Sequence, residues 1–138
     1  MMKEKWIKWI PAEGLSNKYD IDLICDKTDG FEILFTDFKN EQKKVRVEFK
    51  DSVDAYRNTD ESFRVKDINS LSEQYGDDFY GSWTFFKVEN SSYAQWLSEQ
   101  SYGFLKASDL IHFVFIGANC ILDVISTYEP KIHLFEEK

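Results

Sequence analysis

The chain has 138 residues and a mass of 16.3 kDa, the commonest size for one domain, so we expect residues 1–138 to form a single globular domain. Hydrophobic residues make up 43% of the sequence, which is enough for one core without a metal or disulfides. A net charge of −8 repels phosphate backbones and anionic lipids, so we expect no nucleic acid and no membrane as partners, and a basic partner is favoured.

Apolar and polar residues alternate in three segments near the start of the chain: residues 19–25, 31–35 and 45–49. Alternation with period two is typical of antiparallel strands buried on one face. Asp29-Gly30 is a favoured hairpin turn, and the second connection, residues 37–43, is polar. The sequence therefore predicts a three-stranded meander. Residues 53–57 either extend its sheet or bend away from it, and the polar run 58–62 is expected to be a loop.

The hydrophobic period then changes to that of a helix. Asp67 is a plausible N-cap, Gly76 suits the C-terminal cap, and one face carries three apolar side chains, Ile68, Leu71 and Tyr75. The aromatic stretch 83–88 predicts a strand. A second helix follows it, with Asn90, Ser91 or Ser92 as N-cap and Gln95 placed as in a capping box. The buried stripe expected on this helix consists of Tyr93, Trp96 and Leu97.

Three further strands are expected in the last third of the chain: residues 110–116, 120–125 and 132–135. Residues 117–119 form the turn between the first two, and Glu129-Pro130 separates the last two. The run 110–116 is apolar on both faces apart from His112, which predicts a central strand with helices covering one side. The order of elements predicts an α+β fold: a mainly antiparallel sheet of about six to seven strands with two short helices packed on it.

Candidate catalytic residues are few. His112, Cys120 and Asp123 lie close in sequence across a tight turn, so a Cys-His-Asp arrangement is conceivable, although a structural histidine is favoured. Asp26, Asp29 and Glu32 resemble a fragment of a calcium loop, but their spacing fits a hairpin better. The sequence has no Gly-rich phosphate loop, Cys-x-x-Cys pair or HExxH motif. We therefore expect no cofactor and no metal site, and we expect the protein not to be an enzyme.

The cysteines and the N-terminal stretch bear on localisation. Cys25 and Cys120 lie in apolar runs, without the closely spaced cysteines of small secreted domains, and we expect them to be free thiols. Residues 1–10 mix lysines with apolar residues and contain no stretch long enough for a signal peptide or a membrane span. The expected localisation is cytoplasmic.

The negative charge is concentrated in the middle of the chain, where residues 60–101 carry 3 basic and 8 acidic side chains. A surface that mixes carboxylates with aromatic side chains suits the binding of a basic protein, because aromatics supply contact area and carboxylates steer and pair with Lys or Arg. The candidate partner-binding residues are Asp60, Glu61, Glu73, Asp77, Asp78, Tyr80, Glu89 and Glu99. The alternative interpretation is that these acids only solvate the outer faces of helices.

A spaced pattern that spans nearly the whole chain consists of Trp6 and Trp9, Tyr19, Asp29-Gly30-Phe31, Phe49, Tyr56-Arg57, Glu61, Tyr75-Gly76, Trp83, Asn90-Ser91, Tyr93, Leu97, His112-Phe113, and Asp123-Val124 through Pro130. This pattern resembles the small cytosolic immunity proteins that Gram-positive bacteria encode beside polymorphic toxins. Among these are the immunity proteins of cell-wall-associated toxins of the WapA type. The resemblance implies a non-catalytic protein that binds and blocks the C-terminal domain of a cognate toxin, often a nuclease. It supplies no catalytic residues, and the toxin-contacting positions vary between members.

The leading hypothesis from the sequence is thus an immunity protein that neutralises a toxin of a contact-dependent or other polymorphic toxin system by surface complementarity. An interaction or scaffold domain with another partner is the second possibility, and the sequence does not separate it from the first. A small hydrolase or transferase that uses His112 with Asp123 or Cys120 is the third.

Overall fold

The computed structural model describes residues 3–137 and contains nine strands and two α-helices in that range. The strands are β1 (Lys5–Lys8), β2 (Tyr19–Lys27), β3 (Gly30–Asp37), β4 (Lys43–Phe49), β5 (Ala55–Asp60), β6 (Phe85–Glu89), β7 (Ile111–Ile116), β8 (Cys120–Ser126) and β9 (Lys131–Glu136). The helices are α1 (Val65–Tyr75) and α2 (Ser92–Gln100), and the single 3-10 turns η1 (Glu61–Phe63) and η2 (Ala107–Asp109) accompany them. The α+β class and the antiparallel pairing predicted from the sequence are confirmed.

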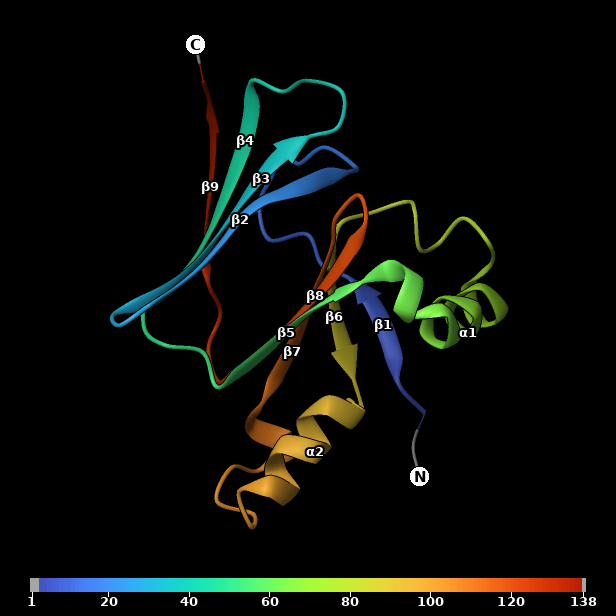
Figure 1. Cartoon of the computed structure of the whole chain (residues 1–138), viewed down its shortest axis with the longest axis vertical. Coiled ribbons are helices and arrows are strands. Elements are labelled where there is room, and N and C mark those ends of the chain that lie inside the picture. Colours follow the sequence, from blue (N-terminus) through green and yellow to red (C-terminus); the bar gives the residue numbers. More distant parts are fainter. Residues whose placement is uncertain (1–2, 138) are drawn as a thin grey trace.

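The strands form two antiparallel sheets rather than one (Figure 1). The predicted meander β2-β3-β4 is present, and β9 pairs with β4 to complete a four-stranded sheet. The five-stranded sheet has the order β1-β6-β7-β8-β5, so β7 is central as expected. Residues 55–60 pair with β8 and join this second sheet, which means that the predicted loop at 58–62 is wrong for residues 58–60.

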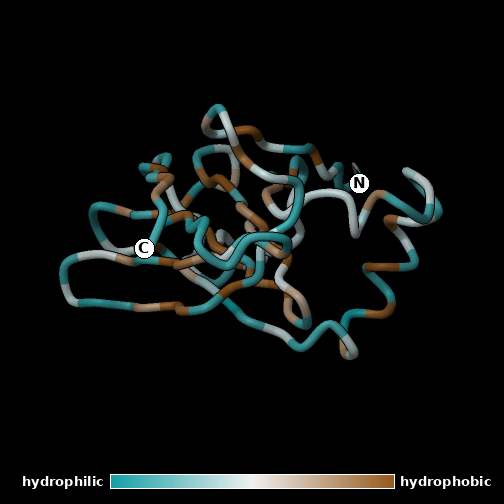
Figure 2. The backbone as a smooth tube through the Cα atoms, turned by 90° about the horizontal axis from the view of Figure 1, so that it is seen from above, coloured by the Kyte–Doolittle hydropathy of each residue, from teal (hydrophilic) through white to brown (hydrophobic). Residues whose placement is uncertain are grey.

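The two sheets share one apolar core. The ring centroids of Phe35 in β3 and Phe85 in β6 are 5.2 Å apart, and those of Phe49 in β4 and Phe113 in β7 are 5.5 Å apart. The amide of Tyr19 donates to Thr84 Oγ1 at 2.8 Å, which fixes the start of β2 to the chain just before β6. Figure 2 shows many of the hydrophobic stretches near the centre of the molecule and hydrophilic loops at the periphery.

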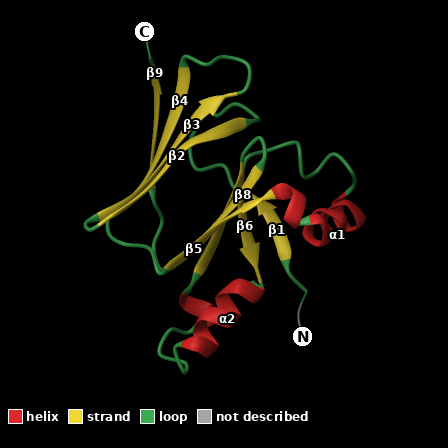
Figure 3. Ribbon diagram, viewed as in Figure 1, coloured by secondary structure: helices red, strands yellow, loops and turns green. Residues whose placement is uncertain are grey.

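Because successive side chains of a strand point to opposite faces, the five-stranded sheet has a second buried face, turned away from the four-stranded sheet. The two helices cover much of it. The hydroxyl of Tyr75 at the end of α1 accepts the amide of Trp6 in β1 at 3.1 Å. On α2, Tyr93 and Ala94 are buried together with Ile125 of β8. Figure 3 shows α1 beside β1, and α2 next to the end of β6.

The helix α1 begins at a different residue from the one expected, whereas the N-cap of α2 is one of the three expected. The helix α1 starts at Val65 with Arg64 as its N-cap, and Asp67 lies in its first turn. The helix α2 is capped by Ser91, whose hydroxyl oxygen accepts the amide of Ala94 at 2.9 Å, so Ser92 and Gln95 do not form the capping box. Gly76 ends α1 as predicted, with a φ of 97° that favours glycine.

Candidate functional site

The most elaborate polar cluster of the described residues lies on the helix-covered face of the five-stranded sheet, around Asp123 in β8. Its carboxylate is fully buried and accepts three partners. Oδ2 lies 2.9 Å from Arg57 Nε on β5 and 2.8 Å from Arg64 Nη1, at the start of α1. Oδ1 lies 2.7 Å from Nε2 of His112 on β7. A buried carboxylate in the middle of a sheet is tolerable only with such compensation.

The chain of hydrogen bonds continues from His112 to the second helix. The Oγ atom of Ser91 lies 2.7 Å from His112 Nδ1, and the same hydroxyl caps α2. Arg64 and Ser91 are thus the N-cap residues of the two helices. Arg64 is hydrogen-bonded to Asp123 directly, and Ser91 is connected to it through His112. The cluster therefore anchors the start of each helix to the centre of the sheet.

The charge of Asp123 is stabilised in spite of its burial. Burial by itself raises the pKa of a carboxyl, but the hydrogen bond and charge of His112, followed by the charges of Arg64 and Arg57, outweigh that effect. The pKa of Asp123 therefore lies well below its usual range. Arg64 is held in turn by Asp67, whose Oδ2 lies 2.7 Å from Arg64 Nε, and the carboxylates of both aspartates raise the pKa of this guanidinium against the effect of burial.

Ser91, His112 and Asp123 lie in the order hydroxyl, imidazole, carboxylate that serine hydrolases use. The surroundings favour a structural role, since the imidazole is only 3% exposed and two guanidinium groups already balance the carboxylate. Catalysis by this row of side chains also requires that a substrate reach Ser91.

The conceivable Cys-His-Asp arrangement is not formed. Cys120 has the parity of Leu122 in β8, so its side chain points to the face of the sheet opposite to that of Asp123. Ser91 is the hydroxyl that contacts His112, and its place in the sequence predicts only a helix cap. A signal for it existed in Asn90-Ser91 at a strand-to-helix junction, but the pairing with His112 depends on the sheet order.

Six of the eight candidate partner-binding residues belong to one continuous segment that contains η1, α1 and the turn after α1. They are Asp60, Glu61, Glu73, Asp77, Asp78 and Tyr80, and we call them the α1 surface. The hydroxyl of Tyr80 donates to Glu61 Oε2 at 3.0 Å, which ties the end of this segment to its beginning. Ser72 donates to Asp77, and Asp60 accepts the amide of Ser62 at 2.9 Å. The surface is therefore built on a fixed backbone.

The carboxylates of the α1 surface lack basic partners. Within residues 3–137, no Lys, Arg or His nitrogen lies within 4.0 Å of a carboxylate oxygen of Glu73, Asp77 or Asp78, and all three residues are exposed. On the four-stranded sheet, by contrast, Glu32 lies 3.3 Å from Lys27 and 3.1 Å from Arg46. The negative charge of the α1 surface is thus left open to a partner.

The remaining two candidates lie elsewhere. Glu89 ends β6 and pairs in register with Lys5 of β1, and Glu99 lies on the last turn of α2. Both are exposed. The continuous acidic stretch of the sequence is therefore divided between the two helical regions of the fold. The expected stripe on α2 also differs, because Trp96 is 50% exposed although its ring stacks on that of Tyr93.

Polar groups at the edge of the α1 surface have shifted pKa values. Burial lowers the pKa of Lys18 to about 8, although Glu61 and Asp20 act in the opposite direction. Burial, the hydrogen bond to Glu61 and its charge raise the pKa of Tyr80. Burial also raises the pKa of the Cys120 thiol, so this thiol is less nucleophilic near neutral pH than an exposed one.

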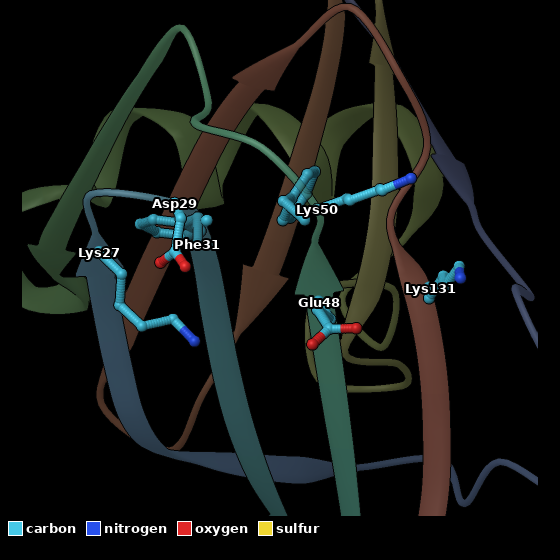
Figure 4. A pocket seen from close by; sticks show the side chains of 8 residues that line it. Lys27, Asp29, Phe31, Glu48, Lys50 and Lys131 are labelled. Atoms are coloured by element: carbon cyan, nitrogen blue, oxygen red, sulfur yellow. The ribbon is translucent and has the colours of Figure 1, made fainter.

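Two shallow hollows lie on the four-stranded sheet, remote from these residues in the fold. The first, of about 250 Å³, lies at the β2–β3 turn and is lined by Lys27, Asp29, Gly30, Phe31, Glu48, Phe49, Lys50 and Lys131. Figure 4 shows Lys27 and Asp29 on one side of it and Lys50 and Lys131 on the other. The second, of about 440 Å³, is lined by Asp22, Thr36, Glu41, Gln42, Lys44 and Glu137. Neither hollow reaches Ser91, His112 or Asp123.

Neither α1 nor α2, the helices of residues 3–137, has the length and apolar composition needed to span a lipid bilayer. No family model, curated protein or solved structure matches the chain.

Proposed function

We propose that this chain is an immunity protein that binds a cognate bacterial toxin domain and blocks it by surface complementarity. The observation that carries the proposal is the α1 surface, where exposed carboxylates without basic partners are fixed on a hydrogen-bonded backbone. Unpaired charges of one sign accelerate association with a partner of the opposite sign, and a fixed backbone reduces the entropy lost on binding. The proposed site of action is the cytoplasm.

A nuclease domain is the toxin chemistry that this charge suits best. A nuclease binds phosphates through a basic surface, and an acidic inhibitor competes when its carboxylates occupy the positions of those phosphates. The accessible surface of the protein is 8410 Å². A standard interface takes about 800 Å² from each partner, or roughly a tenth of that area. The α1 surface therefore serves as the interface, and the two sheets serve as its scaffold.

The experiment that tests this proposal combines capture with protection. The tagged chain is used to capture partners from its native host at low salt, and bound proteins are identified by mass spectrometry. The toxin domain encoded nearest to the gene is then expressed in a sensitive host with and without the chain. We expect capture of that domain in about equimolar amount and survival only in the presence of the chain. A folded bait that captures no such domain and gives no protection contradicts the proposal.

A matched variant links the result to the α1 surface. We expect the triple variant Glu73→Lys, Asp77→Lys and Asp78→Lys to reduce protection. The control is a triple charge reversal at one end of the four-stranded sheet, Glu41→Lys, Glu136→Lys and Glu137→Lys, which should leave protection unchanged. All six residues are exposed, so neither variant should affect folding. Equal protection by both variants would place the interface on another part of the chain, and the proposed immunity function itself would stand.

A further inference from the structure

Three aromatic side chains of α2 and the loop after it are exposed to solvent. Trp96 is 50% exposed, Phe104 is 88% exposed and Tyr102 is 100% exposed. We call these three residues the aromatic knob. A large aromatic side chain contributes roughly 150–250 Å² of surface, so the knob offers on the order of 400 Å². That is about half of what one partner contributes to a standard protein interface.

The loop that carries the knob is held by its own hydrogen bonds. The amide of Gly103 donates to the carbonyl of Ser98 at 2.9 Å, and the amide of Leu105 donates to Ser101 Oγ at 2.9 Å. Tyr102 has a φ of 53°, in the left-handed region that an aromatic residue adopts at a cost. Tyr102 therefore has a strained backbone conformation although its side chain does not pack in the core. Figure 1 shows this loop at the opposite end of the molecule from the C-terminus.

The guanidinium group of Arg57 lies near Trp96, one of the three residues of the aromatic knob. The Cζ atom of Arg57 is 4.1 Å from the centroid of the Tyr93 ring, and the centroids of Tyr93 and Trp96 are 5.8 Å apart. Arg57 Nε is used by Asp123, which fixes the plane of the group. Within residues 3–137, its terminal amino groups have no hydrogen-bond acceptor, and the side chain is 44% exposed. The two terminal amino groups of Arg57 can therefore donate to one more carboxylate in the bidentate geometry that arginine prefers.

We infer that the aromatic knob and Arg57 form a second contact surface, which inserts into an apolar groove of the protein partner that has a carboxylate at its rim. Arginine, tryptophan and tyrosine are the residue types that carry most of the binding energy in protein interfaces. A polyanion such as nucleic acid is disfavoured as occupant, because the net charge of −8 repels it while a single carboxylate needs only Arg57. The inference rests on the proposed function, since it assigns this surface to the same toxin domain.

The two surfaces are expected to affect different rate constants. Charge on the α1 surface acts on association over a distance, whereas desolvated aromatic contacts act after docking and slow dissociation. The test measures association and dissociation rates between the chain and the toxin domain captured above, by surface plasmon resonance. The variants are Trp96→Ala, Phe104→Ala, Tyr102→Gly and Arg57→Lys, and the control variants Phe38→Ala and Ile10→Ala remove exposed apolar side chains elsewhere, 52% and 70% exposed.

We expect Trp96→Ala and at least one of the two loop variants to raise the dissociation rate about tenfold or more, with the association rate nearly unchanged. Arg57→Lys keeps the charge but loses the two-pronged geometry, so it should also accelerate dissociation. The controls should stay within about twofold of the unmodified protein. Tyr102→Gly relieves the strained φ, so we expect this variant to fold, and its thermal unfolding is measured beside its binding.

Three results would overturn the inference, and they are distinguishable. If the unmodified chain binds the toxin domain and all knob variants dissociate at its rate, the inference is wrong while the proposed function stands. If the unmodified chain does not bind the domain at all, both are wrong. Light scattering in the absence of partner adds a third outcome. A dimer that Trp96→Ala converts to a monomer would show that a second copy of the chain covers the knob, and would also overturn the inference.

Discussion

Arg64 Nη1 lies 2.8 Å from Asp123 Oδ2, so the residue that begins α1 is bound to the middle of β8. The side chain of Arg64 is 11% exposed and that of Asp123 is fully buried. Desolvated charges of this kind stabilise each other, and removal of one leaves the other with less compensation, from Asp67 for Arg64 and from Arg57 and His112 for Asp123. The position of the α1 surface therefore depends on the carboxylate of Asp123, which is buried and is not part of the proposed interface with the toxin domain.

The first prediction concerns that carboxylate. Asp123→Asn keeps the shape of the side chain but leaves Arg64 with only the partly exposed Asp67 as its counter-charge and His112 without its anionic partner. We expect the free energy of unfolding to fall by about 3 kcal/mol, measured by urea denaturation. Asp109→Asn, at an exposed position outside the cluster, is the control and should change it by less than about 0.5 kcal/mol. A similar small change for Asp123→Asn would contradict the structural importance of the pair.

The second prediction concerns the acid dependence of stability. The pKa of Asp123 is lowered in the folded protein, so between the folded and unfolded pKa values the unfolded chain binds the proton more readily. The stabilising contribution is fully present above the unfolded pKa of about 3.9 and is lost as the pH falls below it. We expect unfolding free energies measured from pH 6 to pH 2 to fall more steeply for the unmodified protein than for Asp123→Asn. Parallel curves would show that other carboxylates dominate.

The meander β2-β3-β4 could be predicted because its information is local. Alternation marks the strands, and Asp29-Gly30 marks the turn to within one residue, because the turn lies at residues 28–29 and Gly30 begins β3. Gly30 approaches Phe49 so closely that a Cβ atom would lie 3.0 Å from its carbonyl oxygen. The sequence leaves residues 53–57 open and predicts a loop at 58–62, because β5 is an edge strand with mostly exposed, polar side chains. Only its pairing with β8 makes it a strand, and that pairing joins residues far apart in the sequence.

The candidate site was predictable in part for the same reason. The acids of the α1 surface lie within one segment, residues 60–78, so their presence on one part of the fold depends mainly on local structure. The cluster at Asp123 requires the β7–β8 register together with the position of α2, which brings Ser91 to His112 across 21 residues. The division of the strands into two sheets likewise cannot be predicted from hydrophobic periodicity. Alternation indicates which face of a strand is buried, but not which sheet packs against that face.

The third prediction addresses association through the α1 surface. Reversal of Glu73, Asp77 and Asp78 to lysine removes the unpaired negative charge and should slow association with the toxin domain about tenfold or more at low salt. The difference should shrink as salt is raised from 20 to 300 mM, because screening shortens the range of the interaction. Stopped-flow fluorescence measures the rates. A slower rate that does not depend on salt would indicate a change of shape rather than of charge.

The fourth prediction separates the structural from the catalytic interpretation of Ser91. Ser91→Ala removes the cap of α2 and the partner of His112 Nδ1, so we expect a loss of about 1–2 kcal/mol in unfolding free energy. Ser91→Asp retains an N-cap oxygen and should recover part of the loss. The native protein should not react with a fluorophosphonate, because His112 is 3% exposed. Stoichiometric labelling of Ser91, abolished in His112→Gln, would instead support a hydrolase.

The fifth prediction concerns two residues near the ends of α2 whose backbone adopts the left-handed conformation, Asn90 and Tyr102. Tyr102 has a φ of 53° and Asn90 a φ of 56°, but only the asparagine is of a type that adopts this conformation readily. The Asn90 side chain also donates to the carbonyl of Lys3 at 3.2 Å. Tyr102→Gly should therefore stabilise the protein by about 1 kcal/mol, whereas Asn90→Gly should gain nothing or lose stability. Thermal unfolding at equal concentration measures both. Destabilisation by Tyr102→Gly would mean that the tyrosine ring contributes contacts to the fold, and would remove the reason to regard its exposure as reserved for a partner.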